Sequence, residues 1–570
     1  MVDAVLTNKS VAAPRVRPRA SAEDWIMRAC LGAISVYLLI TVVLPLYTML
    51  IKSVQNEDGA FVGLSNFYKY FEDPALVGSL GNTFFVSILG AIITLTIAFL
   101  YSYALTRTRM PGRQTFKAIA LIPLLAPSLL SGLSLVYLFG NQGIFKSVLF
   151  GEDIYGPIGI VIGEVFFALP HAVMIISTAL ATSDQGLYEA AESLRASPSR
   201  IFFSVTLPGC RYGLISAGFV VFTLIFTDFG VPKVIGGSYN VLATDVYRQV
   251  IGQFNFQMGA VVGLFLLFPA VISFAVDRLV QRKQVALLSA RAVPLDPKVR
   301  PLTDRLFFLF CCLVSAFLLL VLGMAAFGSV IKFWPYNLSL TLKWYDFNKL
   351  GTDGWTPYVN SLIMSASVAV IGTAIAFAGA YFVEKSRGFK FGRSLIHFMA
   401  MIPLAVPGLV LGLSYIFFFN DPDNPFNFIY GTLAILVVNT ISHFYTVCHL
   451  TAVTALKQVD AEFESVSASL KVPFYRTFFK VTAPVCLPAV LDISIYYFVN
   501  AMTTVSAVVF LYSSQTKVMS INALNTDDAG NTAAACAMGM TIVATSAGVK
   551  VLHAAMMRGL SRRTQAWRKR

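Results

Sequence analysis

The chain has 570 residues, of which 56% are hydrophobic and only 13% are charged, and its formal net charge is +14. Globular domains average about 25% charged residues, so this composition excludes a chain of soluble domains and equally a disordered chain. The seven cysteines follow no CxxC spacing, which argues against a disulfide scaffold or a cysteine metal site. The surplus of apolar residues must face lipid.

Apolar runs of the length needed to cross a bilayer, about 20 residues, recur along the whole chain. They lie near 26–52, 79–105, 117–140, 157–181, 211–228, 258–277, 306–331, 358–383, 395–419, 430–456, 486–511 and 531–556. The fifth run is short, and its C-terminal end is poorly defined. The sequence therefore predicts about twelve transmembrane helices.

The basic residues lie in short loops between these runs, which is typical of membrane proteins and not of a nucleic-acid surface. Most of the 43 Lys and Arg residues fall in alternate loops. Those loops are Lys9–Arg19, Arg107–Lys117, Arg195–Arg211, Arg278–Arg305, Lys385–Arg393, Lys457–Lys480 and Arg558–Arg570. Because such loops face the cytoplasm, both termini are expected there. The polar segment 1–25 shows no cleavage pattern and predicts a tail, not a removed signal.

The chain is an internal repeat. Residues 122–139 (IPLLAPSLLSGLSLVYLF) match residues 402–419 (IPLAVPGLVLGLSYIFFF), and Asn82 and Asn360 open similar spans before them. Two halves with six spans each share one orientation, so their pseudo-two-fold axis should run along the membrane normal. The predicted domains are 26–281 and 306–557, joined by a cytoplasmic linker at 282–305 and followed by a basic tail at 558–570.

The loop after the fourth span, LYEAAESLRASPSRIFFSVTLP (187–208), predicts two short helices. The first covers Tyr188–Leu194, and Ser197 with Pro198 starts the second as N-cap and first-turn proline. Pro208 is expected to end the loop before the next span.

This loop resembles the EAA loop of binding-protein-dependent ABC importer permeases, on the residues Glu189, Ala190, Ala191 and Pro208. The resemblance implies that the loop docks in a groove of a separate ATPase subunit. The second copy, 463–484, is degenerate: Ser465 stands at the place of Glu189, Glu464 comes one residue early, and Pro484 matches Pro208.

The glycine of the family motif is replaced by Arg195 in one loop and Lys471 in the other. Glycine normally supplies a left-handed turn at a helix end, so that turn is not expected here.

No GxxxxGK[ST] phosphate loop occurs in the chain. We therefore expect a transport subunit that is not itself an enzyme, with no cofactor of its own, no metal site and no catalytic residues. ATP and Mg would bind to the partner ATPase.

Polar residues within apolar spans are costly and indicate functional positions. The spans that follow the two loops pair Thr227 and Asp228 with Thr503 and Thr504, near Asn500. Gly230 and Pro232 predict a break in the first of these helices, which points to a ligand site. With Glu164, these residues form the candidate substrate path; a structural role in hydrogen bonding between helices, or at a polar helix end, remains the alternative. His171, His443, His449 and Asp492 are weaker candidates, with the same structural alternatives.

The whole chain is similar to the fused two-domain permeases of the iron(III), spermidine and phosphonate importer group, and the stretch 227–260 looks most like 2-aminoethylphosphonate permeases. The resemblance implies an all-α polytopic membrane protein with two tandem six-helix type I ABC importer (MetI-like) permease domains. It would import a small polar solute, 2-aminoethylphosphonate, across the bacterial inner membrane by alternating access. The implied partners are ABC ATPase subunits and a periplasmic solute-binding protein.

Three alternatives stay open at this point. The first is an iron(III) or polyamine permease of the same architecture. The second is a secondary transporter with six-plus-six spans, although the loop 106–117 lacks the acidic residue expected of one. The third is a membrane enzyme acting on lipid, for which the sequence shows no nucleophile–base or metal-ligand spacing.

Overall fold

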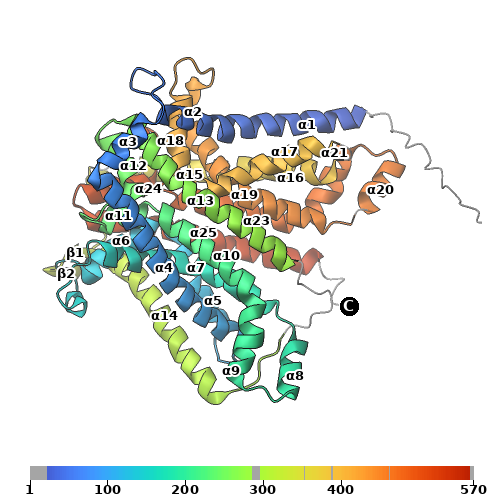
Figure 1. The fold of residues 1–570 in the computed structure, drawn as a ribbon, viewed down its shortest axis with the longest axis horizontal. Helices are drawn as coiled ribbons and strands as arrows, with labels where there is room; N and C mark the ends of the chain where they lie inside the picture. Colours follow the sequence, from blue (N-terminus) through green and yellow to red (C-terminus); the bar gives the residue numbers. More distant parts are fainter. Residues whose placement is uncertain (1–21, 286–294, 352, 387–388, 461, 565–570) are drawn as a thin grey trace, which may run out of the picture.

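The fold is almost entirely helical (Figure 1), in a computed structural model that describes residues 22–285, 295–351, 353–386, 389–460 and 462–564. Parts of the predicted tails, 1–25 and 558–570, and of the predicted linker, 282–305, lie outside these residues. Within the described residues, nine helices are long and apolar enough to cross a membrane, and three bent helix pairs raise the number to twelve. The prediction of an all-α polytopic protein with about twelve spans is confirmed.

The first half comprises α1 to α13. Their bounds are α1 (Ala22–Leu38), α2 (Leu44–Ser53), α3 (Ser65–Glu72), α4 (Pro74–Arg107), α5 (Arg113–Ala120), α6 (Ser128–Phe139), α7 (Pro157–Ala181), α8 (Gln185–Ser193), α9 (Pro198–Ile201), α10 (Leu207–Thr227), α11 (Gly230–Ile235), α12 (Leu242–Tyr247) and α13 (Phe256–Val285). A π-helical segment, Leu39–Val43, joins α1 to α2 in one continuous helix.

The second half comprises α14 to α25 and one short antiparallel hairpin. Their bounds are α14 (Pro301–Gly328), β1 (Ile331–Phe333), β2 (Asn337–Leu340), α15 (Thr356–Ser367), α16 (Thr373–Lys385), α17 (Lys390–Met401), α18 (Gly408–Phe419), α19 (Leu433–Lys457), α20 (Glu462–Ser469), α21 (Phe474–Thr477), α22 (Ala483–Val485), α23 (Leu487–Thr503), α24 (Met519–Asp528) and α25 (Thr532–Thr564). In the hairpin, Ile331 pairs with Leu340 and Phe333 with Asn337.

The matched IPLxxP segments bend the chain sharply in both halves. The third expected span, 117–140, bends by 101°, and the ninth, 395–419, bends by 113°. The residue before a proline is driven out of the helical conformation, and Ala126 and Val406 are indeed extended before Pro127 and Pro407. The apolar length of these two runs predicts a span in each half but carries no information about the bend, which the prolines impose.

The fifth span is longer than predicted. A single 30-residue helix runs from Pro198 to Thr227, and it widens into a π-helical segment at Phe202–Thr206 just before Pro208. Pro208 therefore lies inside this helix, at the start of α10, and does not end the loop; the π-helical segment just before it accommodates the proline. The equivalent span of the second half, which also carries Pro488, bends by 75° between α22 and α23.

The first span of each half packs on the other half. Helix α14 contacts α4, α5 and α6 of the first half, while α1 contacts α16 and α17, and α2 contacts α18. Figure 1 shows α1 lying along the second half and α14 along the first. The sequence boundaries of the two halves are therefore not the boundaries of the two packed bundles.

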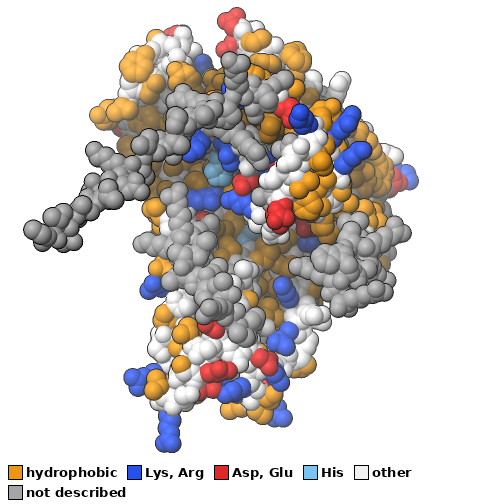
Figure 2. All heavy atoms as spheres, turned by 90° about the vertical axis from the view of Figure 1, so that its right-hand side faces the viewer, with side chains coloured by type: hydrophobic (Ala, Val, Ile, Leu, Met, Phe, Trp, Pro, Cys, Tyr) orange, Lys and Arg blue, Asp and Glu red, His pale blue; other side chains and the backbone are white. Residues whose placement is uncertain are grey.

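The molecule has two distinct ends in Figure 1. One, which we call the coupling end, carries α8 and α20; the other, the hairpin end, carries β1, β2, α11, α12 and α24. Figure 2 looks onto the coupling end, where Lys and Arg side chains are spread among exposed hydrophobic ones.

Candidate functional site

The first EAA-like loop forms the first predicted short helix as α8, whereas the second, α9, is the beginning of the long helix Pro198–Thr227. Helix α8 begins earlier than expected, because Asp184 caps it by accepting the backbone N–H of Gly186 at 3.1 Å. Ser197 caps α9 through the N–H of Arg200, and Pro198 occupies its first turn. Both residues therefore adopt their predicted positions at the helix start.

The residues at the place of the family glycine nevertheless adopt the left-handed turn in both loops. Arg195 has φ +53° and Lys471 has φ +50°. The following N–H groups close the helix ends, from Ala196 to Ala191 O and from Val472 to Ser467 O. This is the glycine-type helix ending, so the expectation that the cations would prevent the turn was wrong.

Each loop presents a row of exposed apolar side chains at the coupling end. On α8 and its last turn the row is Leu187, Ala190 and Leu194; on α20 it is Phe463, Val466 and Leu470. The spacing i, i+3, i+7 places each row on one helix face. Leu194 is 84% exposed and Leu470 is 70% exposed, so both rows are available to a partner.

The opposite faces of the two loops are held by different chemistry. In the first half the Arg107 guanidinium lies over the Tyr188 ring, 5.3 Å from its centroid, and donates to Leu180 O and Ser183 Oγ. In the second half Lys385 Nζ lies 2.9 Å from Glu464 Oε1, and both side chains are largely buried. Glu464 therefore faces its own bundle and does not replace the exposed Glu189, which accepts from Gln185 at 2.6 Å.

The described part of the linker lies along α8. Lys298 pairs with Glu192 at 2.5 Å, Asp296 pairs with Arg109 at 2.5 Å, and the N–H of Asp296 donates to Gln185 Oε1. Glu192 and Gln185 lie on the side of α8 opposite Leu194. The linker thus supports the helix from behind and leaves the apolar row free.

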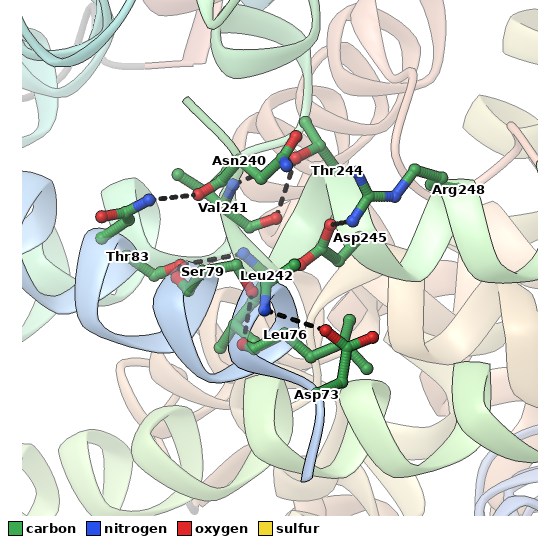
Figure 3. A network of polar contacts seen from close by, with 12 residues as sticks. Asp73, Leu76, Ser79, Thr83, Asn240, Val241, Leu242, Thr244, Asp245 and Arg248 are labelled. Carbon is green, nitrogen blue, oxygen red and sulfur yellow. Dashed lines mark hydrogen bonds and ion pairs between the residues drawn. The ribbon is translucent and has the colours of Figure 1, made fainter. Parts of the chain in front are cut away.

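At the hairpin end, an amide and a hydroxyl of the long helix α4 hold the segment that follows the broken helix (Figure 3). Asn82 Nδ2 donates to Asn240 O at 3.0 Å, and the N–H of Leu242 donates to Thr83 Oγ1 at 2.8 Å. Beside them, the fully buried Asp245 pairs with Arg248 at 2.7 Å. We call Asn82 and Thr83 the first latch.

The second half repeats this arrangement. Asn360 Nδ2 donates to Gln515 O and Lys517 O, and the N–H of Met519 donates to Ser361 Oγ at 2.7 Å. We call Asn360 and Ser361 the second latch. Matching Met519 with Leu242 places the uncharged Asn522 where the first half has Asp245. The ion pair beside the second latch is instead formed by Lys517 and Asp353.

The candidate path residues of the first half come together at the break after α10. Asp228 ends α10 and accepts the N–H of Val231 at 2.9 Å. Its carboxyl group faces that of Glu164, which is fully buried on α7. Neither Glu164 oxygen has a donor among the described residues. Two carboxylates this close repel each other unless a proton or a cation lies between them.

The other candidate path residues bond mainly to their own helix. Thr227 donates to Thr223 O, Thr503 to Val499 O and Asn500 to Tyr496 O, all within 3.0 Å. Thr504 ends α23 where Asp228 ends α10, and its carbonyl accepts from Ser520 Oγ. No hydrogen bond or ion pair between described residues joins these side chains to Glu164 or Asp228.

Of the weaker candidates, Asp492 forms a contact between helices, whereas His171, His443 and His449 each bury a ring nitrogen without a partner among the described residues. Asp492 lies 3.3 Å from His553 and so links α23 to α25. Both ring nitrogens of the buried His449 lack a hydrogen-bond partner among the described residues. Among all residues that the structure describes, no group of three His, Cys, Asp or Glu side chains could hold a metal ion.

The latches and the Arg107 and Lys385 contacts were missed from the sequence. A signal for the latches existed, because an amide followed by a hydroxyl residue occurs at Asn82–Thr83 and again at Asn360–Ser361. The contacts of Arg107 and Lys385 join residues far apart in the chain, so no local pattern reveals them.

Comparison with known proteins agrees with this architecture. The family model of the binding-protein-dependent transport system inner membrane component matches residues 102–286 and 372–565. The ferric transport system permease protein FbpB of Actinobacillus pleuropneumoniae is 29% identical over 485 residues, which cover 82% of this chain and 69% of that protein. The Fe(3+)-transport system permease protein FbpB 2 of Haemophilus influenzae is 23% identical over 467 residues, covering 81% and 86%.

Among solved structures, a bacterial ABC transporter that imports the acidic polysaccharide alginate matches 47% of this chain and 97% of its own, at 16% identity and a TM-score of 0.39. That match is too distant to carry an argument. The family match covers both halves of the repeat and includes both loops. The chain therefore belongs to the inner membrane components of binding-protein-dependent transport systems, the permease subunits of ABC importers.

Proposed function

We propose that the coupling end faces the bacterial cytoplasm and binds ABC ATPase subunits through the rows Leu187–Ala190–Leu194 and Phe463–Val466–Leu470. One observation supports this most strongly: large apolar side chains are exposed on polar loops at the same place of each half. Burying a leucine side chain contributes about 2 kcal/mol. A protein groove that covers both rows would thus hold the subunit firmly.

The polar residues around each row would complete the contact. The exposed Glu189 is available to a basic residue of the partner, and the small Ala190 and Ala191 allow close helix approach. As a permease subunit the chain is not an enzyme, and ATP hydrolysis belongs to the partner. Closure of the ATPase subunits would move α8 and α20, which lead through a corner and α9 or α21 into the spans beside the path.

The proposed substrate is ferric iron or a ferric complex, delivered by a periplasmic binding protein at the hairpin end. Two relatives that cover most of this chain are named for iron(III) transport. The Glu164–Asp228 carboxyl pair supports a cationic cargo, because carboxylate oxygens are ligands that hard cations prefer. The expectation of 2-aminoethylphosphonate is not confirmed by the relatives.

2-Aminoethylphosphonate remains the second candidate on one observation. Its ammonium group could also meet the carboxyl pair, and the hydroxyl groups of Thr503 and Thr504 in the opposite half could meet a phosphonate. A binding protein purified with this permease and incubated with radioactive ferric citrate and, separately, labelled 2-aminoethylphosphonate distinguishes the two. Retention of the phosphonate alone would overturn the iron proposal.

Docking and substrate path are tested separately. Glu189→Lys should uncouple ATP hydrolysis from uptake in proteoliposomes while the protein stays folded, and normal uptake would contradict the docking proposal. Asp228→Asn should lower uptake without reducing ATPase co-purification. Unchanged uptake in that variant would remove Asp228 from the path.

A further inference from the structure

Several side-chain contacts join the halves at the hairpin end, such as those of Trp334 with Tyr137 and Gln142. Two of these contacts lie beside the broken helices. Lys233 Nζ on α11 lies 3.0 Å from Asp528 Oδ1 at the end of α24. Tyr247 of the first half stacks on Phe510 of the second, with ring centroids 6.1 Å apart and an interplanar angle of 27°. Lys233 Nζ also lies 5.4 Å from the Tyr247 centroid, so the four residues form one cluster. Among the described residues, no other ion pair crosses from α1–α13 to α14–α25.

We propose that Lys233, Asp528, Tyr247 and Phe510 form the gate that closes the transport path at the hairpin end. The proposal rests on the proposed function, because it assumes that substrate enters at this end. The cluster lies where the segments after the two broken helices meet: α11 follows the break at Asp228, and Phe510 follows α23.

The two aromatic members are carried by firmly held segments of their own halves. The first latch and the buried Asp245–Arg248 pair fix α12, which carries Tyr247 (Figure 3). Phe510 lies against Gly412 of α18, where an added Cβ would come within 2.8 Å of Ala507 O. Because the side chains cannot follow one another when the halves separate, both cross-half contacts must break together.

The strength of the ion pair suits a contact that opens in every cycle. The Lys233 side chain is 24% exposed and that of Asp528 is 43% exposed. Ion pairs this accessible to water contribute little to stability, so they can part and re-form readily. A permanent fastening between the halves would instead be buried.

A cavity of about 570 Å³ lies at the same end, lined by both halves. Tyr137 and Tyr155 line it from the first half, and Trp334 and Asn531 from the second. Its wall at Gly530–Ala533 comes two residues after Asp528. In the proposed scheme this cavity is the vestibule in which substrate waits before the gate.

The test first reverses the charge at Asp528 and then exchanges the charges of Lys233 and Asp528. The permease is reconstituted in liposomes with its ATPase partner, and ATP hydrolysis is measured without binding protein. In Asp528→Lys the repulsion from Lys233 should open the gate and raise hydrolysis about fivefold, equivalent to about 1 kcal/mol. The swap Lys233→Asp with Asp528→Lys should return hydrolysis to within about twofold of the parent.

The chain offers a matched control. Lys517 and Asp353 form an ion pair of nearly the same exposure, 21% and 45%, but both belong to the second half. Asp353→Lys should therefore leave hydrolysis unchanged. The gate proposal is overturned if Asp528→Lys behaves like Asp353→Lys, or if the swap is no closer to the parent than the single variant.

A second measurement uses the unmodified protein and does not depend on the folding of a variant. A zero-length carbodiimide should join the Lys233 amine to the Asp528 carboxylate, and mass spectrometry of the linked peptides measures the yield. Adding ATP and loaded binding protein should lower the yield at least several-fold, since the gate opens; an equal yield contradicts the proposal. A parent protein that binds no ATPase would instead contradict the proposed function.

Discussion

The two halves share a scaffold but differ at the points where they meet a partner or a substrate. Both latches use an amide and a hydroxyl to hold the segment after the broken helix. At the path, however, the first half carries Glu164 and Asp228, while the second ends α23 at the uncharged Thr504. The comparison teaches that the backbone supports are duplicated, whereas the carboxyl pair at the path belongs to the first half alone among the described residues.

The two EAA-like loops, 187–208 and 463–484, show the same combination of shared and different features. Their outer apolar rows are alike, but their inner faces are held by Arg107 and Tyr188 in one half and by Lys385 and Glu464 in the other. Two different pairs therefore fix the same helix position. The following predictions test which of these features are truly equivalent, beginning with the largest expected effect.

Leu194→Asp and Leu470→Asp should each abolish ATPase co-purification and reduce uptake by at least about thirtyfold, as truncation of a central contact costs about 2 kcal/mol or more. Ser193→Asp, which adds the same charge on α8 outside the apolar row, is the control and should retain uptake. If only one leucine variant loses the ATPase, the two loops are not equivalent docking sites.

Glu464→Ala should destabilise the second half by about 2 kcal/mol, because it leaves the largely buried Lys385 without its partner. Tyr188→Ala should cost only about 1 kcal/mol, since Arg107 keeps its bonds to Leu180 O and Ser183. Thermal unfolding in detergent measures both.

A double variant can give the second loop the contact that holds the first loop. Lys385→Arg combined with Glu464→Tyr places the pair of the first half in the second half and should recover most of the stability lost in Glu464→Ala. A double variant no more stable than Glu464→Ala would show that the two pairs are not interchangeable.

Thr83→Val and Ser361→Ala should each cost about 1–2 kcal/mol, because each leaves a backbone N–H near the hairpin end without its acceptor. Thr96→Val is the control, as the Thr96 hydroxyl is exposed and bonds only to its own helix. Equal losses in thermal unfolding support the equivalence of the two latches, and a loss confined to one half argues against it.

Arg195→Gly and Lys471→Gly should stabilise the protein slightly, by about 0.5 kcal/mol each. Glycine removes a left-handed strain of about 1–2 kcal/mol but loses more backbone entropy on folding. Arg200→Gly, within a helix, should instead destabilise by about 1 kcal/mol. Destabilisation by glycine at position 195 or 471 would contradict the strain argument.

Much of the fold could be predicted from the sequence. Apolar length gave the number of spans, and the repeated IPLxxP segments gave the two halves, because burial in lipid dictates both composition and periodicity. The bends at Pro127 and Pro407 were equally available in principle, from the restriction that proline imposes on the preceding residue.

The site was less accessible to sequence reasoning. The coupling loops were found because their motif is local, and Asp228 with Glu164 because charge is rare in an apolar span. The orientation of Glu464 toward Lys385 and the Lys233–Asp528 contact depend on how distant helices pack. Such contacts depend on tertiary geometry, which no local pattern in one sequence records.

The packing of each half's first span on the other half affects how the protein can fold during synthesis. Helices α4, α5 and α6 need α14 to complete their packing, yet α14 begins only at Pro301. At about 5–20 residues per second, the ribosome leaves this face uncovered in the bilayer for on the order of ten seconds. During that interval the first bundle must rely on lipid or an insertion factor. If the chain were cut within the linker, the resulting pieces should therefore be stable only when synthesised together.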